Sequence, residues 1–284
     1  MLTVHNFSYG LLTPALGYLM SFVGAFLGLR CTARARASTG RAKLSWLLVA
    51  GVSIGVTGIW VMHFIAMLGF SIPGRTISYN VLITLGSMLL AVIFVTLGLL
   101  FVGFGTVTRW SLLGAGTVTG LGVAAMHYSG MAAMAAPIKM SYNPLIFALS
   151  VVIAIVAATA ALWAALRLHS LWSTFGAAAI MALAVSGMHY TGMAAIHVFP
   201  GPAMSMGGAS GVSFLLPLII GVSTLTFVLT ATIALAPTDA EISAEADLMR
   251  RINAVQSQEQ VIPAPPIVSS VRRDGRFGGP TLPE

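Results

Sequence analysis

A six-residue string of the pattern Met-His-aromatic-x-small-Met occurs three times in the chain. The copies are Met62-His63-Phe64-Ile65-Ala66-Met67, Met126-His127-Tyr128-Ser129-Gly130-Met131 and Met188-His189-Tyr190-Thr191-Gly192-Met193. Each copy lies in a strongly apolar stretch, where a histidine is costly unless a partner satisfies it. Successive histidines are 64 and 62 residues apart. A repeated unit of the chain therefore presents the same imidazole three times.

Each histidine shares a helical face with the methionine that ends its string, because residues four apart are neighbours on a helix. These pairs are His63 with Met67, His127 with Met131, and His189 with Met193. Imidazole binds zinc, copper, iron and nickel, whereas thioether favours copper, especially Cu(I). The six side chains predict a metal site at which copper is the favoured ion. A haem held by two of the three histidines is the alternative.

Several other side chains are secondary candidates for this site. The methionine before each histidine is turned by about 100° from it, so we expect Met62, Met126 and Met188 to flank the ligands. His5 and His197 fall on the same predicted side of the membrane, and Met204 and Met206 lie in the loop 197–212. His169 falls on the opposite side. Without a metal, each histidine would need a carbonyl or hydroxyl partner on a neighbouring helix, for which the hydroxyl candidates are Thr13, Ser87, Ser129, Ser150 and Thr191.

The composition is that of an integral membrane protein, with 57% hydrophobic residues, 7% charged residues and a mean hydropathy of +0.94. All seven acidic residues follow Pro237, so residues 1–237 contain nine basic residues and no carboxylate. This absence argues against a calcium or magnesium site, a carboxylate proton pathway and an enzyme active site. The single Cys31 excludes an intramolecular disulfide. The basic residues flank the apolar stretches, which indicates topology rather than nucleic-acid binding.

Seven apolar stretches are long enough to span a bilayer, which takes about 20 helical residues. We expect helices near 8–29, 46–69, 81–104, 111–136, 144–167, 172–196 and 213–236. Twelve lysines and arginines fall on one side of these segments and two on the other. Because cytoplasmic loops carry the excess of positive charge, the N-terminus is predicted outside and the C-terminus in the cytoplasm.

The first six helices form three hairpins in tandem, and the seventh stands alone. Asn6, Asn80 and Asn143 each open a hairpin, and Thr13, Ser87 and Ser150 follow seven residues later. The first hairpin is longer, and we expect its extra residues in a basic loop, 30–45. The fold class is thus an all-α integral membrane domain over 5–236. Residues 237–284 form a cytoplasmic tail, predicted to be a short helix over 239–256 and disordered from Pro263 onward.

Met-His-Tyr-Ser and Met-His-Tyr-Thr resemble the motif that defines the MHYT domain, and the resemblance covers about residues 5–236. The first copy departs from it as Met-His-Phe-Ile, which removes both hydroxyls. The resemblance implies a multi-pass sensor of the bacterial inner membrane that holds copper through its Met and His positions and perceives O2, CO or NO. Many relatives carry cyclic-di-GMP output domains, which we do not find in this chain, so signalling is expected to need a separate cytoplasmic partner.

Three functions follow from these observations. The leading hypothesis is a copper-binding, gas-sensing membrane module. A copper-handling permease, or an accessory factor for a respiratory or CO-oxidising complex, is the second, and a haem-binding membrane protein is the third. A purely structural role of the motif is the remaining alternative, and a catalytic role is not expected.

Overall fold

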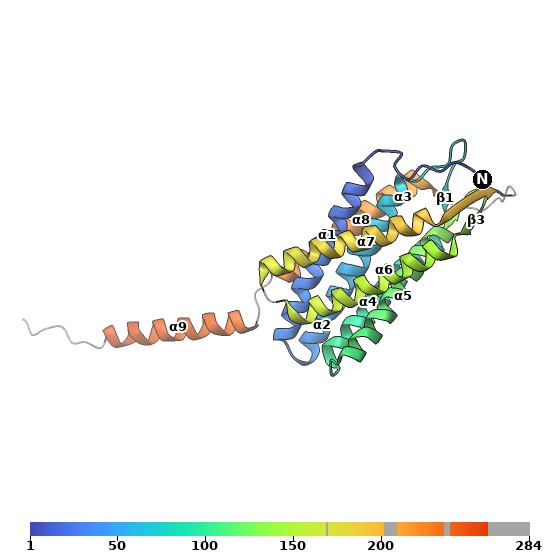
Figure 1. The fold of residues 1–284 in the computed structure, drawn as a ribbon. Coiled ribbons are helices and arrows are strands. Elements are labelled where there is room, and N and C mark those ends of the chain that lie inside the picture. Colours follow the sequence, from blue (N-terminus) through green and yellow to red (C-terminus); the bar gives the residue numbers. More distant parts are fainter. Residues whose placement is uncertain (169, 202–208, 236–238, 261–284) are drawn as a thin grey trace, which may run out of the picture. The chain divides into compact units, whose positions relative to one another are not determined.

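The computed structural model describes residues 1–168, 170–201, 209–235 and 239–260, and the chain divides into two units, Met1–Ala236 and Pro237–Glu284. The first unit is a bundle of long helices (Figure 1). Its helices are α1 (Leu12–Ala37), α2 (Gly40–Val52), the π-helix η1 (Ser53–Val61), α3 (Met62–Leu68), α4 (Val81–Phe104), α5 (Arg109–Ala132), α6 (Pro144–Arg167), α7 (Leu171–Ala194) and α8 (Gly211–Leu235). Its strands are β1 (Ser78–Tyr79), β2 (Met134–Ala135), β3 (Ile138–Tyr142), β4 (Ile196–Pro200) and β5 (Ala209–Ser210).

Six helices of the described residues are long and apolar enough to cross a membrane. They are Leu12–Ala37, Gly40–Leu68, Val81–Phe104, Pro144–Arg167, Leu171–Ala194 and Val212–Thr232. The second of these is continuous through α2, η1 and α3. Helix α5 is 24 residues long but rich in glycine, which lowers its hydropathy. The prediction of an all-α, multi-pass membrane protein is confirmed, while seven crossing helices and their orientation stay predictions.

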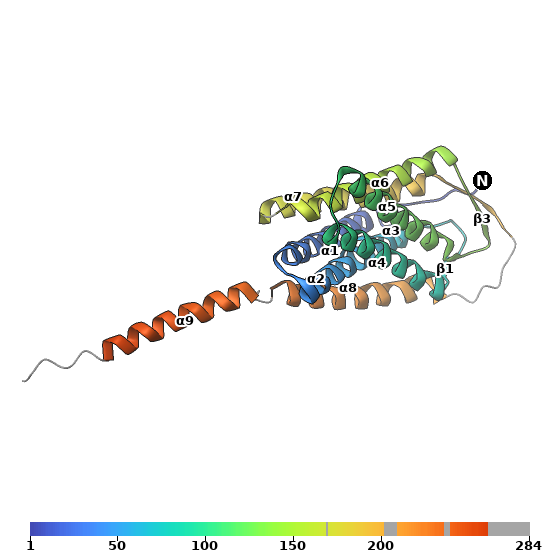
Figure 2. The ribbon, with the colours of Figure 1, turned by 90° about the horizontal axis from the view of Figure 1, so that it is seen from below.

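Six of the long helices close a ring. Helix α1 packs against α7, α7 against α6, α6 against α5, α5 against α4, and α4 against α2 and η1, which return to α1. The continuous helix α2–η1–α3, α5 and α7 therefore alternate with α1, α4 and α6. Helix α8 lies outside the ring against η1, α1 and α3, at the opposite edge from α6 and α7 (Figure 2). The three sequence hairpins thus sit around a common axis.

The first hairpin differs from its prediction. Helix α1 runs to Ala37 and α2 begins at Gly40, so most of the expected basic loop, 30–45, is helical. Arginine and lysine are good helix formers, and Arg36 donates to the carbonyls of Ala165 and Leu168 at the end of α6. A cation favours the carboxyl end of a helix, and this contact stabilises the extension of α1.

The starts of the odd helices agree only in part with the expected repeat. Asn80 and Asn143 cap α4 and α6, and their side chains accept backbone N–H groups of the first turn. Asn6 instead precedes a turn, and α1 begins at Leu12. The prediction that Asn6 opens the first helix was wrong, because Asn6 belongs to the segment whose His5 pairs with Ser71 in a β-bridge.

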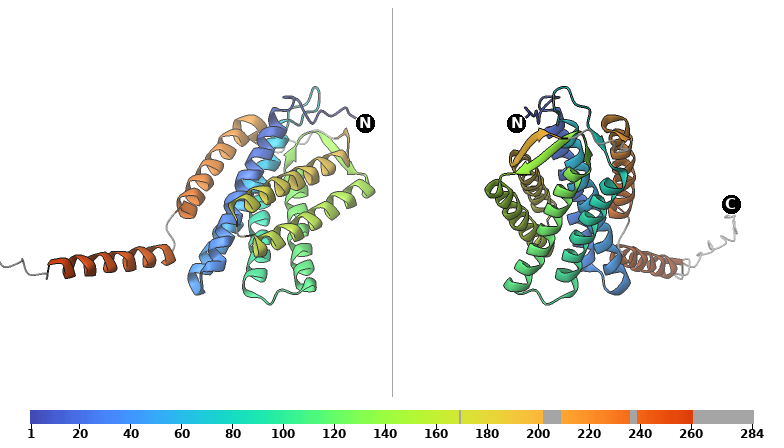
Figure 3. Two further views of the ribbon diagram at one scale, coloured as in Figure 1. Left: turned by 60° about the vertical axis from the view of Figure 1, so that its left-hand side comes forward. Right: turned by 90° about the vertical axis from the view of Figure 1, so that its right-hand side faces the viewer.

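Short strands cover the end of the bundle at which the chain begins, which we call the strand end (Figure 3). β1 lies between β2 and β5, and β3 pairs antiparallel with β4 from Ile138–Pro200 to Tyr142–Ile196. The sequence prediction contained no strands here. They shorten two helices, since α5 ends at Ala132 and α7 at Ala194, where 136 and 196 were expected. Pairing across the repeats ties the segments after α5 and α7 together.

A π-helix in the second transmembrane segment leads directly into the first Met-His string. η1 covers Ser53–Val61, and every residue in it is buried. Its backbone lies close to α1, because a Cβ on Gly24 would come within 2.3 Å of the Gly58 nitrogen. In a π-helix each backbone N–H bonds to the carbonyl five residues earlier. π-helices are rare and are frequently found at functional sites. The backbone before His63 is therefore π-helical, whereas the segments before His127 and His189 are α-helical.

The second unit contains one described helix, α9 (Asp239–Gln260). Its described side chains are exposed, and Arg250 donates to Asp247 over 3.4 Å. An exposed pair of this kind contributes little to stability. The disorder predicted from Pro263 onward lies outside the described residues.

Candidate metal centre

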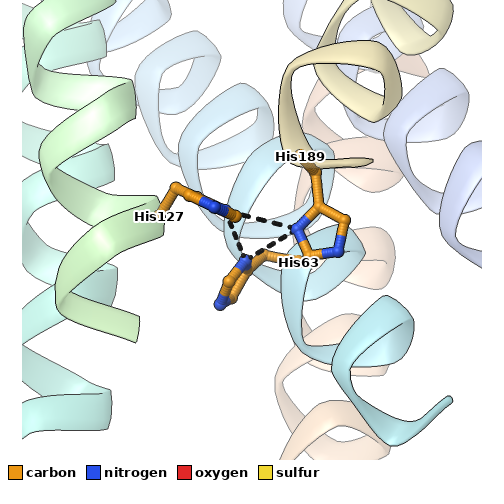
Figure 4. Close-up of side chains that lie close together, drawn as sticks. All are labelled: His63, His127 and His189. Atoms are coloured by element: carbon orange, nitrogen blue, oxygen red, sulfur yellow. Dashed lines mark hydrogen bonds between the residues drawn. The ribbon is translucent and has the colours of Figure 1, made fainter. Parts of the chain in front are cut away.

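The three motif histidines meet in the interior of the bundle. His63 lies on α3, His127 on α5 and His189 on α7, and each is at most 1% exposed. Their Nδ1 atoms are 3.1 Å apart for His63–His127, 3.1 Å for His63–His189 and 3.3 Å for His127–His189. Figure 4 shows the three rings reaching from three helices toward one point. We call this arrangement the histidine triangle.

Hydrogen bonding alone cannot satisfy the histidine triangle. A neutral imidazole nitrogen either carries a proton or offers a lone pair, but not both. Among three mutually close Nδ1 atoms at least two must have the same role, so two protons or two lone pairs face each other. A cation at the centre would accept all three lone pairs. Within the described residues, these histidines are also the one cluster of His, Cys, Asp or Glu side chains close enough to share an ion.

The spacing of the nitrogens matches that of three ligands on one tetrahedral ion. Metal–imidazole bonds of about 2.0–2.1 Å place tetrahedral nitrogen ligands about 3.3–3.4 Å apart. The observed separations of 3.1–3.3 Å lie close to this range. Three protein ligands leave a further position open on such an ion.

Glycines of the motif make room for the rings. A Cβ added to Gly130 would lie 2.5 Å from Nε2 of His63, and one added to Gly192 would lie 2.5 Å from Nε2 of His127. Both glycines occupy the small position of the Met-His string, three residues after the histidine of their own repeat. The imidazoles of His63 and His127 therefore each lie against the backbone of the next repeat. The sequence shows a small residue at this position of each string but not that its neighbour is a histidine ring.

Other glycines on the helices that carry the strings differ in how closely they are packed. A Cβ on Gly122 would come within 2.2 Å of Phe94, and Gly58 lies against α1, whereas a Cβ on Gly187 would meet nothing within 4 Å. Gly187 is exposed on α7. Spacing from the motif does not reveal which face of α7 a glycine occupies.

The outward nitrogens of the triangle have no partner. Nε2 of all three histidines is buried without a hydrogen bond to any described residue. Three of the predicted hydroxyl partners bond elsewhere: Ser129 donates to the Met126 carbonyl, Ser150 to the Phe147 carbonyl and Ser87 to the Thr84 carbonyl. The Thr13 hydroxyl is buried without a partner among the described residues. Hydrogen bonds from the histidines to these three serines, one form of the non-metal alternative, are not found among the described residues.

The methionines of the strings are all buried. Met67, Met131 and Met193 follow the histidines by one turn, and helical side chains lean back toward the preceding turn, which is the histidine turn. The preceding methionines have different surroundings: Met62 contacts the position of Gly17 on α1, and Met188 lines an apolar cavity. Met67, Met131 and Met193 as sulfur ligands therefore stay a prediction.

The remaining candidates lie apart from the triangle. His5 is exposed and pairs with Ser71 in a β-bridge. His197 was expected to continue the helical face of His189, but α7 ends at Ala194 and His197 pairs with Ser141 between β4 and β3. A strand does not preserve the four-residue periodicity of a helix. Met204, Met206 and His169 lie outside the described residues.

A model of the MHYT family, described as a bacterial signalling protein N-terminal repeat, matches residues 57–115 and 120–178. The chain belongs to the MHYT family. The two matched repeats contain His63 and His127, and the third Met-His string follows the second match. The family assignment and the six membrane-crossing helices make the first unit a membrane signalling module.

Several curated proteins are similar to this MHYT chain. It is 39% identical over 210 residues to the bifunctional diguanylate cyclase/cyclic di-GMP phosphodiesterase MucR of Pseudomonas aeruginosa, covering 72% of the chain and 30% of MucR. It is 36% identical over 199 residues to the cyclic di-GMP phosphodiesterase NbdA of the same organism, covering 68% of the chain and 25% of NbdA. It is 30% identical over 195 residues to the signaling protein YkoW of Bacillus subtilis, covering 66% of the chain and 24% of YkoW. The chain therefore spans less than a third of the matched relatives, and no solved structure matches it.

Proposed function

We propose that the chain is the sensory input module of a membrane signalling protein and that His63, His127 and His189 hold one copper ion through their Nδ1 atoms. The convergence of these atoms at 3.1–3.3 Å carries the proposal. Three buried lone pairs directed at one point favour a cation, and hydrogen bonds among the rings cannot replace it. An ion bound there would offer an open position to a diatomic gas such as O2, CO or NO.

Copper is favoured over zinc by the other groups nearby. Met67, Met131 and Met193 are buried one turn after the histidines, and thioethers select Cu(I). Residues 1–237 offer no carboxylate, and Cys31 is buried on α1 away from the cluster. A haem with two axial histidines would need its macrocycle between two rings. The rings of the triangle touch one another, with centroids 4.9–5.0 Å apart, which argues against haem.

A sensor fits this geometry better than a permease does. A conduction path needs binding sites at several depths, whereas the three histidines share one. Positive charge gathers at the end of the bundle opposite the strand end, on Arg30, Arg34, Arg36, Arg41, Lys43, Arg109 and Arg167. By the positive-inside rule that end faces the cytoplasm of the bacterial inner membrane, and seven helices cross. The output is supplied by a cytoplasmic partner or domain, in the manner suggested by the names of MucR and NbdA.

Metal reconstitution of the purified protein tests the proposal. Metal-free protein in detergent should take up one Cu(I) per chain, measured by elemental analysis after gel filtration. Leucine replaces methionine at similar volume, so a variant with leucine at 67, 131 and 193 should still fold and bind metal. Its preference for Cu(I) over Zn(II) in competition should fall relative to wild type.

Three results would contradict the proposal. Folded wild-type protein that takes up no metal would remove the histidine triangle as a metal site. An unchanged Cu(I) preference in the leucine variant would remove the methionines as ligands. An intense Soret band in protein purified from cells would favour haem instead.

A further inference from the structure

An apolar cavity lies beside the histidine triangle, on the side away from the strand end. Its volume is about 50 Å³. The residues four before the three histidines, Ile59, Val123 and Val185, all line it, as does Met188. One helical turn rises about 5.4 Å, so the cavity begins one turn below the rings. The continuous helix α2–η1–α3, α5 and α7, which carry the triangle, therefore also line this space together with α4 and α6.

The cavity arises from a difference between repeats. Helix α4 contributes Val95 to its wall, eight residues after Ser87, whereas α6 has Ala158 eight residues after the equivalent Ser150. Ala154, Ala157 and Ala161 continue the same wall of α6. Small side chains on α6 thus leave space that a valine fills in the neighbouring repeat.

The chemistry of the wall excludes water. Thr119 is the one hydroxyl-bearing side chain among the described residues that line the cavity, and its hydroxyl donates to the Phe94 carbonyl over 3.4 Å. A buried water needs two to four polar partners, and apolar cavities stay dry and take up apolar guests. A water needs about 10–15 Å³ and a benzene-binding cavity has about 150 Å³, so 50 Å³ suits a guest of two or a few atoms.

We propose that this cavity binds one small apolar gas molecule independently of any metal. The choice of O2, CO or NO as the natural occupant rests on the proposed function, because a gas held here would lie about one helical turn from the histidine rings. The capacity to hold an apolar guest rests on the cavity alone. The cavity would then act as a reservoir that raises the local gas concentration beside the histidines.

Xenon provides a test that does not require the metal. Metal-free protein in nanodiscs, with labelled isoleucine and valine methyl groups, is titrated with xenon under pressure. The methyl shifts of Ile59, Val123 and Val185 should saturate. Those of Val152 and Val156, which are exposed on α6, should change only in proportion to xenon pressure.

Cavity-filling variants provide the matched comparison. Ala158→Leu should abolish the saturating shifts, and Ala158→Val, which copies the residue of α4, should lower the affinity for xenon. Ala160→Leu makes the same change on the exposed face of α6 and should leave binding as in wild type. Ala161→Leu fills the cavity from the same wall of α6, about one turn further along. It is the substitute variant if Ala158→Leu does not fold.

The inference would be overturned if the methyl shifts of all five residues rose linearly with xenon pressure. It would also be overturned if the shifts still saturated in folded Ala158→Leu. Failure of copper binding would leave the xenon result intact. The two proposals can therefore fail separately.

Discussion

The three repeats are equivalent at the histidines and differ at the next residue along each helix. In the histidine triangle every ring meets the other two at nearly equal distances. The following residues, Phe64, Tyr128 and Tyr190, form an outer aromatic set in which each member has a different environment. A residue on the common axis must fit two equivalent partners at once, whereas an outer residue fits only its own neighbour.

Three pairings between repeats make the difference concrete. Tyr128 shares a 2.6 Å hydrogen bond with Ser150 of the next repeat. Ser87, the equivalent serine, instead accepts from the Trp60 indole at 3.1 Å, because Phe64 has no hydroxyl. The third pair would be Tyr190 with Thr13, and neither hydroxyl has a hydrogen-bond partner among the described residues. The unbonded pair lies where the last repeat meets the first.

Removing any single histidine is expected to have the largest effect. Because each Nδ1 is one of three ligands, His63→Ala, His127→Ala and His189→Ala should each lower Cu(I) affinity by more than about 100-fold, the upper end of the losses seen for supporting residues. Competition with a Cu(I) chelator measures this loss.

His197→Ala is the matched control, since His197 lies on β4 outside the triangle. Its affinity should equal that of wild type. A large loss for one histidine and none for the other two would contradict the equivalence of the repeats.

The glycines against the rings test the same equivalence through stability. Gly130→Ala and Gly192→Ala would each place a methyl group 2.5 Å from an imidazole nitrogen. Overpacking of this kind costs about 1–3 kcal/mol, so both variants should unfold at lower denaturant concentration than wild type. The free energy of unfolding in mixed micelles is the measurement.

Gly187→Ala controls for helix propensity on α7, because its Cβ meets nothing within 4 Å. Alanine is favoured over glycine in a helix by about 1 kcal/mol, so this variant should be as stable as wild type or more so. Equal effects of all three substitutions would indicate that the rings can move away without loss.

The outer aromatic set should give the smallest effects, and unequal ones. Tyr128→Phe removes the bond to Ser150 and should cost about 0.6 kcal/mol, the mean for side-chain hydrogen bonds between membrane helices. Tyr190→Phe removes a buried hydroxyl that has no described partner, so it should be neutral or stabilising. Thermal unfolding of both variants measures the difference, and matching losses would mean that Tyr190 has a partner after all.

Much of the fold follows from local sequence properties. Apolar length predicted the helix positions of α4 and α6 because their Asn caps and Arg167 mark the ends. The same reasoning misplaced the end of α1, because Arg36 is held by carbonyls of α6, and it missed the strands, whose partners lie in other repeats. Long-range contacts determine both features, and no local pattern encodes them.

The sequence by itself determined the membrane class, the threefold repeat and the identity of the three histidines, because hydropathy and repeated spacing are properties of the chain. Tertiary structure decided that Nδ1 of each ring faces the other two, and it placed Nε2 of His63 and His127 against Gly130 and Gly192 of the neighbouring repeats. It also decided that His197 lies apart and that Ala158 opens a cavity beneath the triangle. Side chains 62–126 residues apart meet only when helices pack, so their distances and the spaces between them belong to the fold.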